Sequence, residues 1–299
     1  MTHGHDLIHS KLSRLEFTLM MSMVMAVTAL AIDMMLPAFG DMRAEFGLAA
    51  DSNTIALVVT VFLLGLGFGQ PLWGPLSDSL GRKPVLYAGL AVYVIGALGA
   101  ALSGSLTVLL VARFVGGFGA AGPRVVSQGV VRDAYKGEAM AKVMSYVMAA
   151  FILIPILAPS IGAAILAIGS WHTTFIAIAA FGIIVGVWTL RLPETLPEHR
   201  RIPLSFAKLG LAARSVMTNR FTMGLTFAQA VIFGFFASYL ASSQLFIDDI
   251  YGLDDLFPFV FGGQAVVLGI GMITNPRLLD RFGLRMILRS VFITYLVMT

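Results

Sequence analysis

Long apolar segments alternate with short polar ones along almost the whole chain. A helix that crosses a bilayer needs about 20 mostly apolar residues, and most of these segments reach that length. The pattern therefore predicts an all-α polytopic membrane protein. We expect nine spans, at about 17–38, 53–73, 84–104, 105–131, 138–168, 171–191, 219–246, 253–275 and 284–299.

The first apolar segment follows Lys11 and Arg14, as the hydrophobic part of a signal peptide would. It is longer than the 7–15 residues or so of such a region, and no small-residue cleavage site follows it. We expect it to be retained as a membrane helix.

Basic residues indicate the orientation, because Lys and Arg collect in cytoplasmic loops. If the N-terminus is cytoplasmic, every Lys and Arg except Arg43 and Arg113 lies at or near the cytoplasmic side. The loops on the other side are short or acidic, as in DDIYGLDD at 248–255. The sequence thus predicts a cytoplasmic N-terminus.

Composition supports a membrane protein and excludes several other classes. Charged residues make up 12% of the chain, against about 25% in a soluble domain. The net charge is +4, and the basic residues lie mainly on one side of the predicted membrane. We therefore take this charge as a sign of membrane orientation, and we expect no nucleic-acid partner. The chain has no cysteine, and we expect no metal site at His3, His5 and His9.

The stretch GFGAAG at 117–122 has the G-x-G-x-x-G spacing of a dinucleotide-binding loop. That motif binds a pyrophosphate only between a strand and a soluble helix, whereas here it lies inside the fourth predicted span. Glycines in a membrane helix usually allow close helix packing, which is the role we expect.

An internal repeat divides the chain. Asp78 and Gly81 match Asp280 and Gly283 at an offset of 202 residues, and Lys83 matches Arg285 at the same offset. Two parallel six-span repeats are the architecture of a major facilitator transporter. We therefore expect an N-terminal six-helix bundle at 1–191, a cytoplasmic central linker at 192–218 and a partial C-terminal bundle at 219–299.

The second half is expected to be truncated after about two and a half helices. Only 14 residues follow Arg285, whereas a crossing takes about 20. A natural nine-span protein is the alternative to a C-terminally truncated one.

Several motifs carry a more specific resemblance. GPLSDSLGRKPVL at 74–86 resembles the major facilitator loop motif G-x-x-x-D-x-x-G-R-K, and RFVGGFGAAGPRVVSQGVVRD resembles the arginine-glycine antiporter motif. APSIGA at 158–163 resembles the antiporter motif G-P-x-x-G-G, with Ala158 and Ala163 departing from it. Together with AIDMMLP, LPET and IDDIYGL, these motifs are similar to those of Bcr/CflA-type multidrug/proton antiporters.

The resemblance implies a bacterial inner-membrane exporter of drugs or other small polar or amphipathic compounds. Its energy source would be the proton gradient, with no cofactor, and we expect a monomer in the lipid bilayer. A sugar or metabolite efflux antiporter and an inactive fragment of a transporter remain alternatives. An enzyme is not expected, because the first eight spans contain no cluster of His, Asp or Glu.

Asp33 and Arg113 are the two ionisable residues well inside those spans. They lie about 8 and 12 Å below the outer surface, and such residues usually face a cavity or each other. We expect Asp33 to bind a proton or a polar substrate group, and Arg113 to favour the charged form of Asp33 when the two approach. A purely structural ion pair is the alternative.

Three further groups are candidates by motif. The first is a cytoplasmic gating loop, for which the alternative is a purely topological role; its members are Gly74, Asp78, Gly81, Arg82 and Lys83, with Arg132 and Asp133 as neighbours. The second is an antiporter helix containing Pro155, Pro159 and Gly162, which simple helix packing would explain equally well. The third is the second-repeat loop with Asp280, Gly283 and Arg285.

Overall fold

The computed structural model describes residues 12–49, 52–251 and 256–298, and every regular element in these ranges is a helix. The prediction of an all-α protein is therefore confirmed for this part of the chain. The elements are α2 (Arg14–Asp33), η1 (Leu36–Ala38), α3 (Phe39–Glu45), η2 (Asn53–Ala56), α4 (Leu57–Leu80), α5 (Arg82–Ala101), α6 (Leu106–Ala134), α7 (Gly137–Ile168), α8 (Trp171–Trp188), η3 (Thr189–Arg191), η4 (Glu198–Arg200), α9 (Phe206–Thr218), α10 (Arg220–Tyr251) and α11 (Phe257–Met298).

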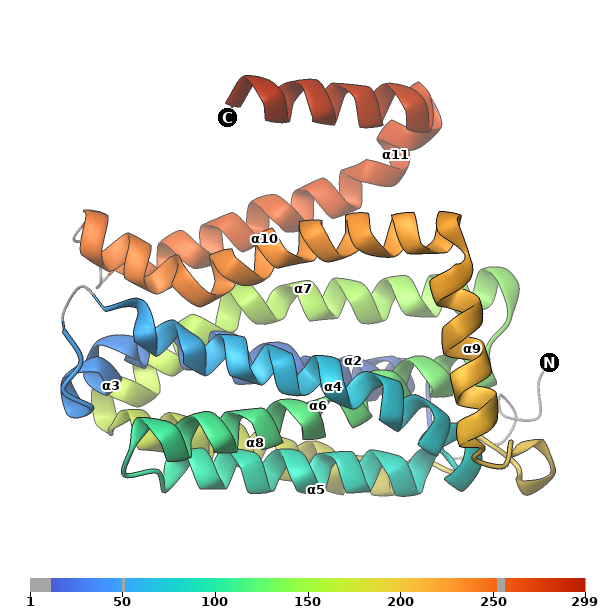
Figure 1. Cartoon of the computed structure of the whole chain (residues 1–299), viewed down its shortest axis with the longest axis horizontal. Helices are drawn as coiled ribbons and strands as arrows, with labels where there is room; N and C mark the ends of the chain where they lie inside the picture. The colour runs from blue at the N-terminus through green and yellow to red at the C-terminus, as the bar shows by residue number, and fades with distance from the viewer. Residues whose placement is uncertain (1–11, 50–51, 252–255, 299) are drawn as a thin grey trace.

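Most of the long helices lie side by side in a bundle, whereas the C-terminal part of α11 turns away from it (Figure 1). Six stretches are long and apolar enough to cross a membrane, and α7 and α11 contain the shorter apolar stretches Ile156–Ile168 and Phe259–Gly271. The protein is therefore a multi-pass membrane protein. We call the end of the bundle that carries Gly81 and residues 189–205 the basic end, which is on the right in Figure 1.

The first span is interrupted near its far end. Helix α2 ends at Asp33, and the chain continues through η1, which has Pro37 in its first turn, into α3. A proline has no amide hydrogen to donate and fixes its own φ, which accounts for the break. Asp33 thus lies where a regular helix stops.

Helix α6 packs closely against α4 and α5 because it carries the GFGAAG stretch. A methyl group on Gly117 would overlap the Phe62 carbonyl of α4, and one on Gly119 would overlap the Tyr93 amide of α5. The stretch lies inside a continuous α-helix. The prediction that these glycines permit close helix approach is confirmed.

The internal repeat is visible in the backbone. Gly81, between α4 and α5, has φ 107° and ψ 160°, and Gly283 within α11 has φ 74° and ψ 155°. Positive φ is a conformation that glycine adopts without strain. The two loops that match in sequence therefore make the same kind of sharp turn between helices.

Candidate functional site

Asp33 is buried at the end of α2, with 2% of its surface exposed. Within the described residues no hydrogen bond or ion pair reaches its carboxyl group. Tyr239 of α10 lies within electrostatic range of it. Asp33 of the first span therefore lies close enough to α10 for an electrostatic interaction.

Tyr239 joins α10 to α11 through a polar contact and an aromatic contact. Its hydroxyl donates a hydrogen bond to the Gln264 side chain of α11, and its ring stacks on Phe261 at a centroid distance of 6.2 Å. Both Tyr239 and Gln264 are exposed. Tyr239 is thus linked electrostatically to Asp33 and by a hydrogen bond to Gln264.

Arg113 is buried in α6, with 3% of its surface exposed. Its Nε donates to the Val58 carbonyl at 3.0 Å, and its guanidinium carbon lies 4.2 Å from the Phe62 ring centroid. Its Nη2 has no hydrogen-bond partner among the described residues. A buried cation usually needs a partner, and the Phe62 ring supplies only part of that stabilisation.

Asp33 and Arg113 form no ion pair in the part of the chain that the structure describes. Each interacts with different neighbours: Asp33 lies within electrostatic range of Tyr239 on α10, whereas Arg113 lies against Val58 and Phe62 of α4. Direct coupling of the two charges therefore remains a prediction for another conformation.

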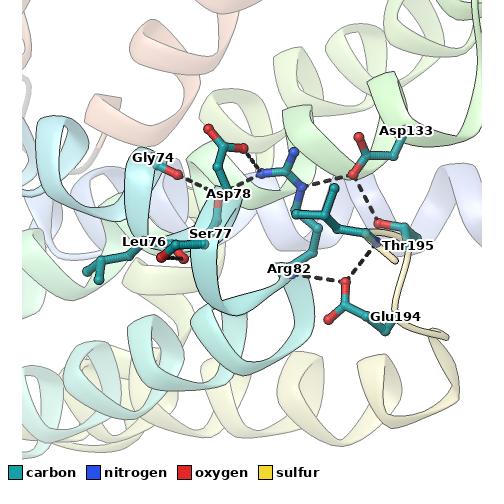
Figure 2. A network of polar contacts seen from close by, with 10 residues as sticks. Gly74, Leu76, Ser77, Asp78, Arg82, Asp133, Glu194 and Thr195 are labelled. Carbon is teal, nitrogen blue, oxygen red and sulfur yellow. Dashed lines mark hydrogen bonds and ion pairs between the residues drawn. The ribbon is translucent and has the colours of Figure 1, made fainter. Parts of the chain in front are cut away.

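A network of charged groups joins α4, α5 and α6 at the basic end (Figure 2). Arg82 donates from Nε to Asp133 at 2.9 Å and from Nη1 to Asp78 at 2.6 Å. It also donates from Nη1 to the Ser77 hydroxyl at 2.7 Å. We call Asp78, Arg82 and Asp133 the latch.

The other residues of the predicted gating loop make different contacts from those of the latch. Lys83 donates from Nζ to the Leu190 carbonyl at 3.0 Å, and the Gly74 carbonyl accepts a hydrogen bond from Ser77. Gly81 makes the turn, as described above. Arg132 is exposed and takes no part in the latch within the described residues.

Sequence reasoning missed two members of this network, Glu194 and Thr195. Glu194 accepts hydrogen bonds from the Arg82 and Lys83 backbone amides, both at 3.0 Å. Thr195 donates to the same Asp133 oxygen that Arg82 binds, at 3.3 Å. The LPET stretch was the available signal, because both residues belong to this motif of the family resemblance.

The predicted antiporter helix is the continuous helix α7. Pro159 and Gly162 are buried in it, and a methyl group on Gly162 would overlap the Met34 carbonyl next to Asp33. The side chains of Pro155, Asp280 and Arg285 lie outside the described residues. Gly162 thus allows α7 to approach the point where the first span breaks.

A second polar cluster lies at the end opposite the latch. The Trp171 indole donates to Glu45 at 2.7 Å, and His172 lies 3.7 Å from the other oxygen of the same carboxylate. The Phe46 ring packs edge-on against Trp171. These contacts attach α3 to the start of α8.

Residues 21–299 match the family model described as Major Facilitator Superfamily. The chain belongs to that family. It is 32% identical over 294 residues to an uncharacterised transporter of the family, YdgK from Bacillus subtilis, covering 96% of this chain and 72% of the relative. It is 30% identical to a bicyclomycin resistance protein homologue from Haemophilus influenzae, covering 91% of this chain and 69% of the relative.

Solved structures support the same family fold. A crystal structure of a D-xylose-proton symporter matches with a TM-score of 0.70 and 15% identity, covering 90% of this chain and 69% of that protein. This likeness concerns the fold alone. The resemblance to the major facilitator family, first indicated by the loop motif and the repeat, is confirmed.

Proposed function

We propose that the protein exports small polar or amphipathic drug molecules in exchange for protons by alternating access. The name of the bicyclomycin resistance relative and the antiporter motifs of α6 and α7 support export. The distribution of basic residues supports a bacterial inner-membrane location with the N-terminus in the cytoplasm. Residues 1–191 and 219–299 would then belong to two moving bundles joined by the linker 192–218.

The burial of the Asp33 carboxyl group is the observation on which the proposal rests. A buried carboxyl group in a membrane helix is costly unless a proton, a cation or a hydrogen-bond donor compensates it. No such donor reaches Asp33 within the described residues, and Tyr239 of α10 lies within electrostatic range of it. Asp33 therefore suits a site that a proton and a polar substrate occupy in turn.

Arg113 is proposed as a fixed positive charge that acts on this exchange. A guanidinium keeps its proton in proteins, so it cannot carry the transported proton itself. A conformational change that moves Arg113 towards Asp33 would favour release of the proton, and its withdrawal would favour uptake. Proton movement would in this way follow the change of access.

The latch is proposed to hold the cytoplasmic side during this cycle. Arg82 connects three helices of the first bundle, so its contacts depend on the relative positions of α4, α5 and α6. The second-repeat loop with Asp280, Gly283 and Arg285 is its proposed counterpart. Gly162 would let α7 follow the break in the first span.

Drug-dependent proton movement in inverted membrane vesicles tests the proposal. Asp33→Asn should reach wild-type levels in the membrane and lose drug-dependent proton release, whereas Asp33→Glu should retain part of it. Asp41→Asn is the matched control, because Asp41 is an exposed acid in α3. Normal exchange in Asp33→Asn would contradict the proposed role of this residue.

A wild-type protein that inserts but moves no drug would contradict the drug-export proposal as a whole. The vesicles would then be tested with sugars and small metabolites. Exchange of one of these for protons would support the metabolite antiporter, and no exchange of any kind would support an inactive fragment.

A further inference from the structure

Helix α5 begins without a cap from its own sequence. Its N-cap residue is Gly81, which has no side chain to accept hydrogen bonds from the first amides of the helix. Such amides need an acceptor, and a carboxylate is also attracted by the positive end of the helix dipole. Glu194, more than 100 residues further along the chain, supplies both.

The Glu194 carboxylate is fixed from several directions. Its Oε1 accepts from the amides of Arg82 and Leu196, at 3.0 and 2.9 Å, and its Oε2 accepts from the Lys83 amide. A methyl group on Gly81 would lie 2.8 Å from Oε2. The loop glycine therefore serves a second purpose, because it leaves room for the carboxylate.

The neighbouring residue acts on the other side of Arg82. Thr195 is buried, with 1% of its surface exposed, and its hydroxyl shares one Asp133 oxygen with the Arg82 guanidinium. Glu194 thus fixes the backbone from which Arg82 projects, and Thr195 fixes the carboxylate that Arg82 binds. Figure 2 shows the two residues beside the latch.

The rest of this segment is attached to the same loop. The Leu190 carbonyl accepts from Lys83, and the Ile202 amide donates to the Asp78 carbonyl at 2.9 Å. We call residues 190–202 the strap. The strap leads through α9 directly to Asn219 and α10, the first helix of the second repeat.

We propose that Glu194 and Thr195 are positioning residues of the latch, and that the strap couples the latch to movement of α10. While the strap is attached, Arg82 is held between Asp78 and Asp133. Displacement of the basic end of α10 pulls on the strap and loosens Arg82, so the gate responds to the position of the second bundle. This role rests on the gating function proposed above.

Transport kinetics give the first test, in the full chain reconstituted in vesicles. Glu194→Ala removes the acceptor of three hydrogen bonds and should lower drug turnover about tenfold, and Thr195→Val removes one hydrogen bond and should lower it about threefold. The half-saturating drug concentration should stay within about twofold. Thr195→Ser should restore turnover, and Glu198→Ala, in the same segment but with a side chain 89% exposed, should leave it unchanged.

Distance measurements give a readout that does not depend on transport. The chain has no native cysteine, so spin labels can be placed at Ala139→Cys and Met217→Cys, both exposed at the basic end. The fraction of molecules in which the two labels are further apart should rise at least twofold in Glu194→Ala and in the milder Glu194→Gln. In Glu198→Ala this fraction should stay as in wild type.

The two readouts separate the inference from the proposed function. If wild type transports drug and the Glu194 variants match Glu198→Ala in turnover and label distances, the strap inference is overturned and the export proposal stands. If wild type moves no drug but Glu194 variants shift the label distances, export is overturned and the strap inference holds.

Discussion

The closeness of α4 and α6 leads to a sharp prediction at Gly69. A methyl group there would lie 2.7 Å from the Phe118 carbonyl oxygen and 2.7 Å from the Ala121 Cβ, both on α6. Ordinary contacts begin at 3.4 Å, so Gly69→Ala requires the helices to separate by about 0.7 Å. The same Phe118 carbonyl accepts a 2.7 Å hydrogen bond from the Trp73 indole, so the shift weakens that bond too.

The magnitude can be estimated against a matched control in the same helix. Overpacking typically costs about 1–3 kcal/mol, and alanine gains about 1 kcal/mol over glycine inside a helix. Gly67→Ala makes the same chemical change, with nothing within 4 Å of the added methyl. The propensity gain therefore cancels between the two variants, and Gly69→Ala should be less stable by about 1–3 kcal/mol.

Thermal unfolding of the detergent-purified protein provides the assay. At about 2 °C per kcal/mol for a chain of this size, Gly69→Ala should unfold roughly 2–6 °C below Gly67→Ala. Tryptophan emission should also shift in Gly69→Ala alone, because the Trp73 hydrogen bond is strained. Equal unfolding temperatures for the two variants would refute the reasoning that backbone contact at Gly69 holds α4 against α6.

Two further substitutions test polar contacts at opposite ends of the bundle. Arg82→Lys should lower the unfolding temperature by about 4 °C, because one ammonium cannot replace a guanidinium that binds Asp78 and Asp133 through different nitrogens. Arg132→Lys, at an exposed neighbouring position, is the control. Equal unfolding temperatures for the two variants would contradict the latch geometry. Trp171→Phe keeps the aromatic packing but removes the hydrogen bond to Glu45, and should lower the unfolding temperature by about 2 °C. Glu45→Ala should add nothing further in the Trp171→Phe background, and additive losses would indicate that the two residues act independently.

The sequence by itself determined the all-helical membrane-spanning character, the family and the repeated loop that contains Gly81. Apolar length defines a span because the bilayer cannot hydrogen-bond an exposed backbone, and this requirement acts locally along the chain. The internal repeat was also recognised from the sequence, because the residues of its two loops match. A turn with positive φ favours glycine at one position, and Gly81 and Gly283 both occupy it. Close packing by the glycines of α6 followed from their small size.

Which side chains meet was decided only by the tertiary structure. Depth in the membrane suggested that Asp33 and Arg113 form a pair, but depth does not give the rotation of a helix about its axis, and Asp33 lies instead within electrostatic range of Tyr239. Glu194 reaches the start of α5 across more than 100 residues of sequence. Periodicity along one helix identifies its apolar face and carries no information about which other helix packs there, because that choice depends on how all the helices fill the bundle together.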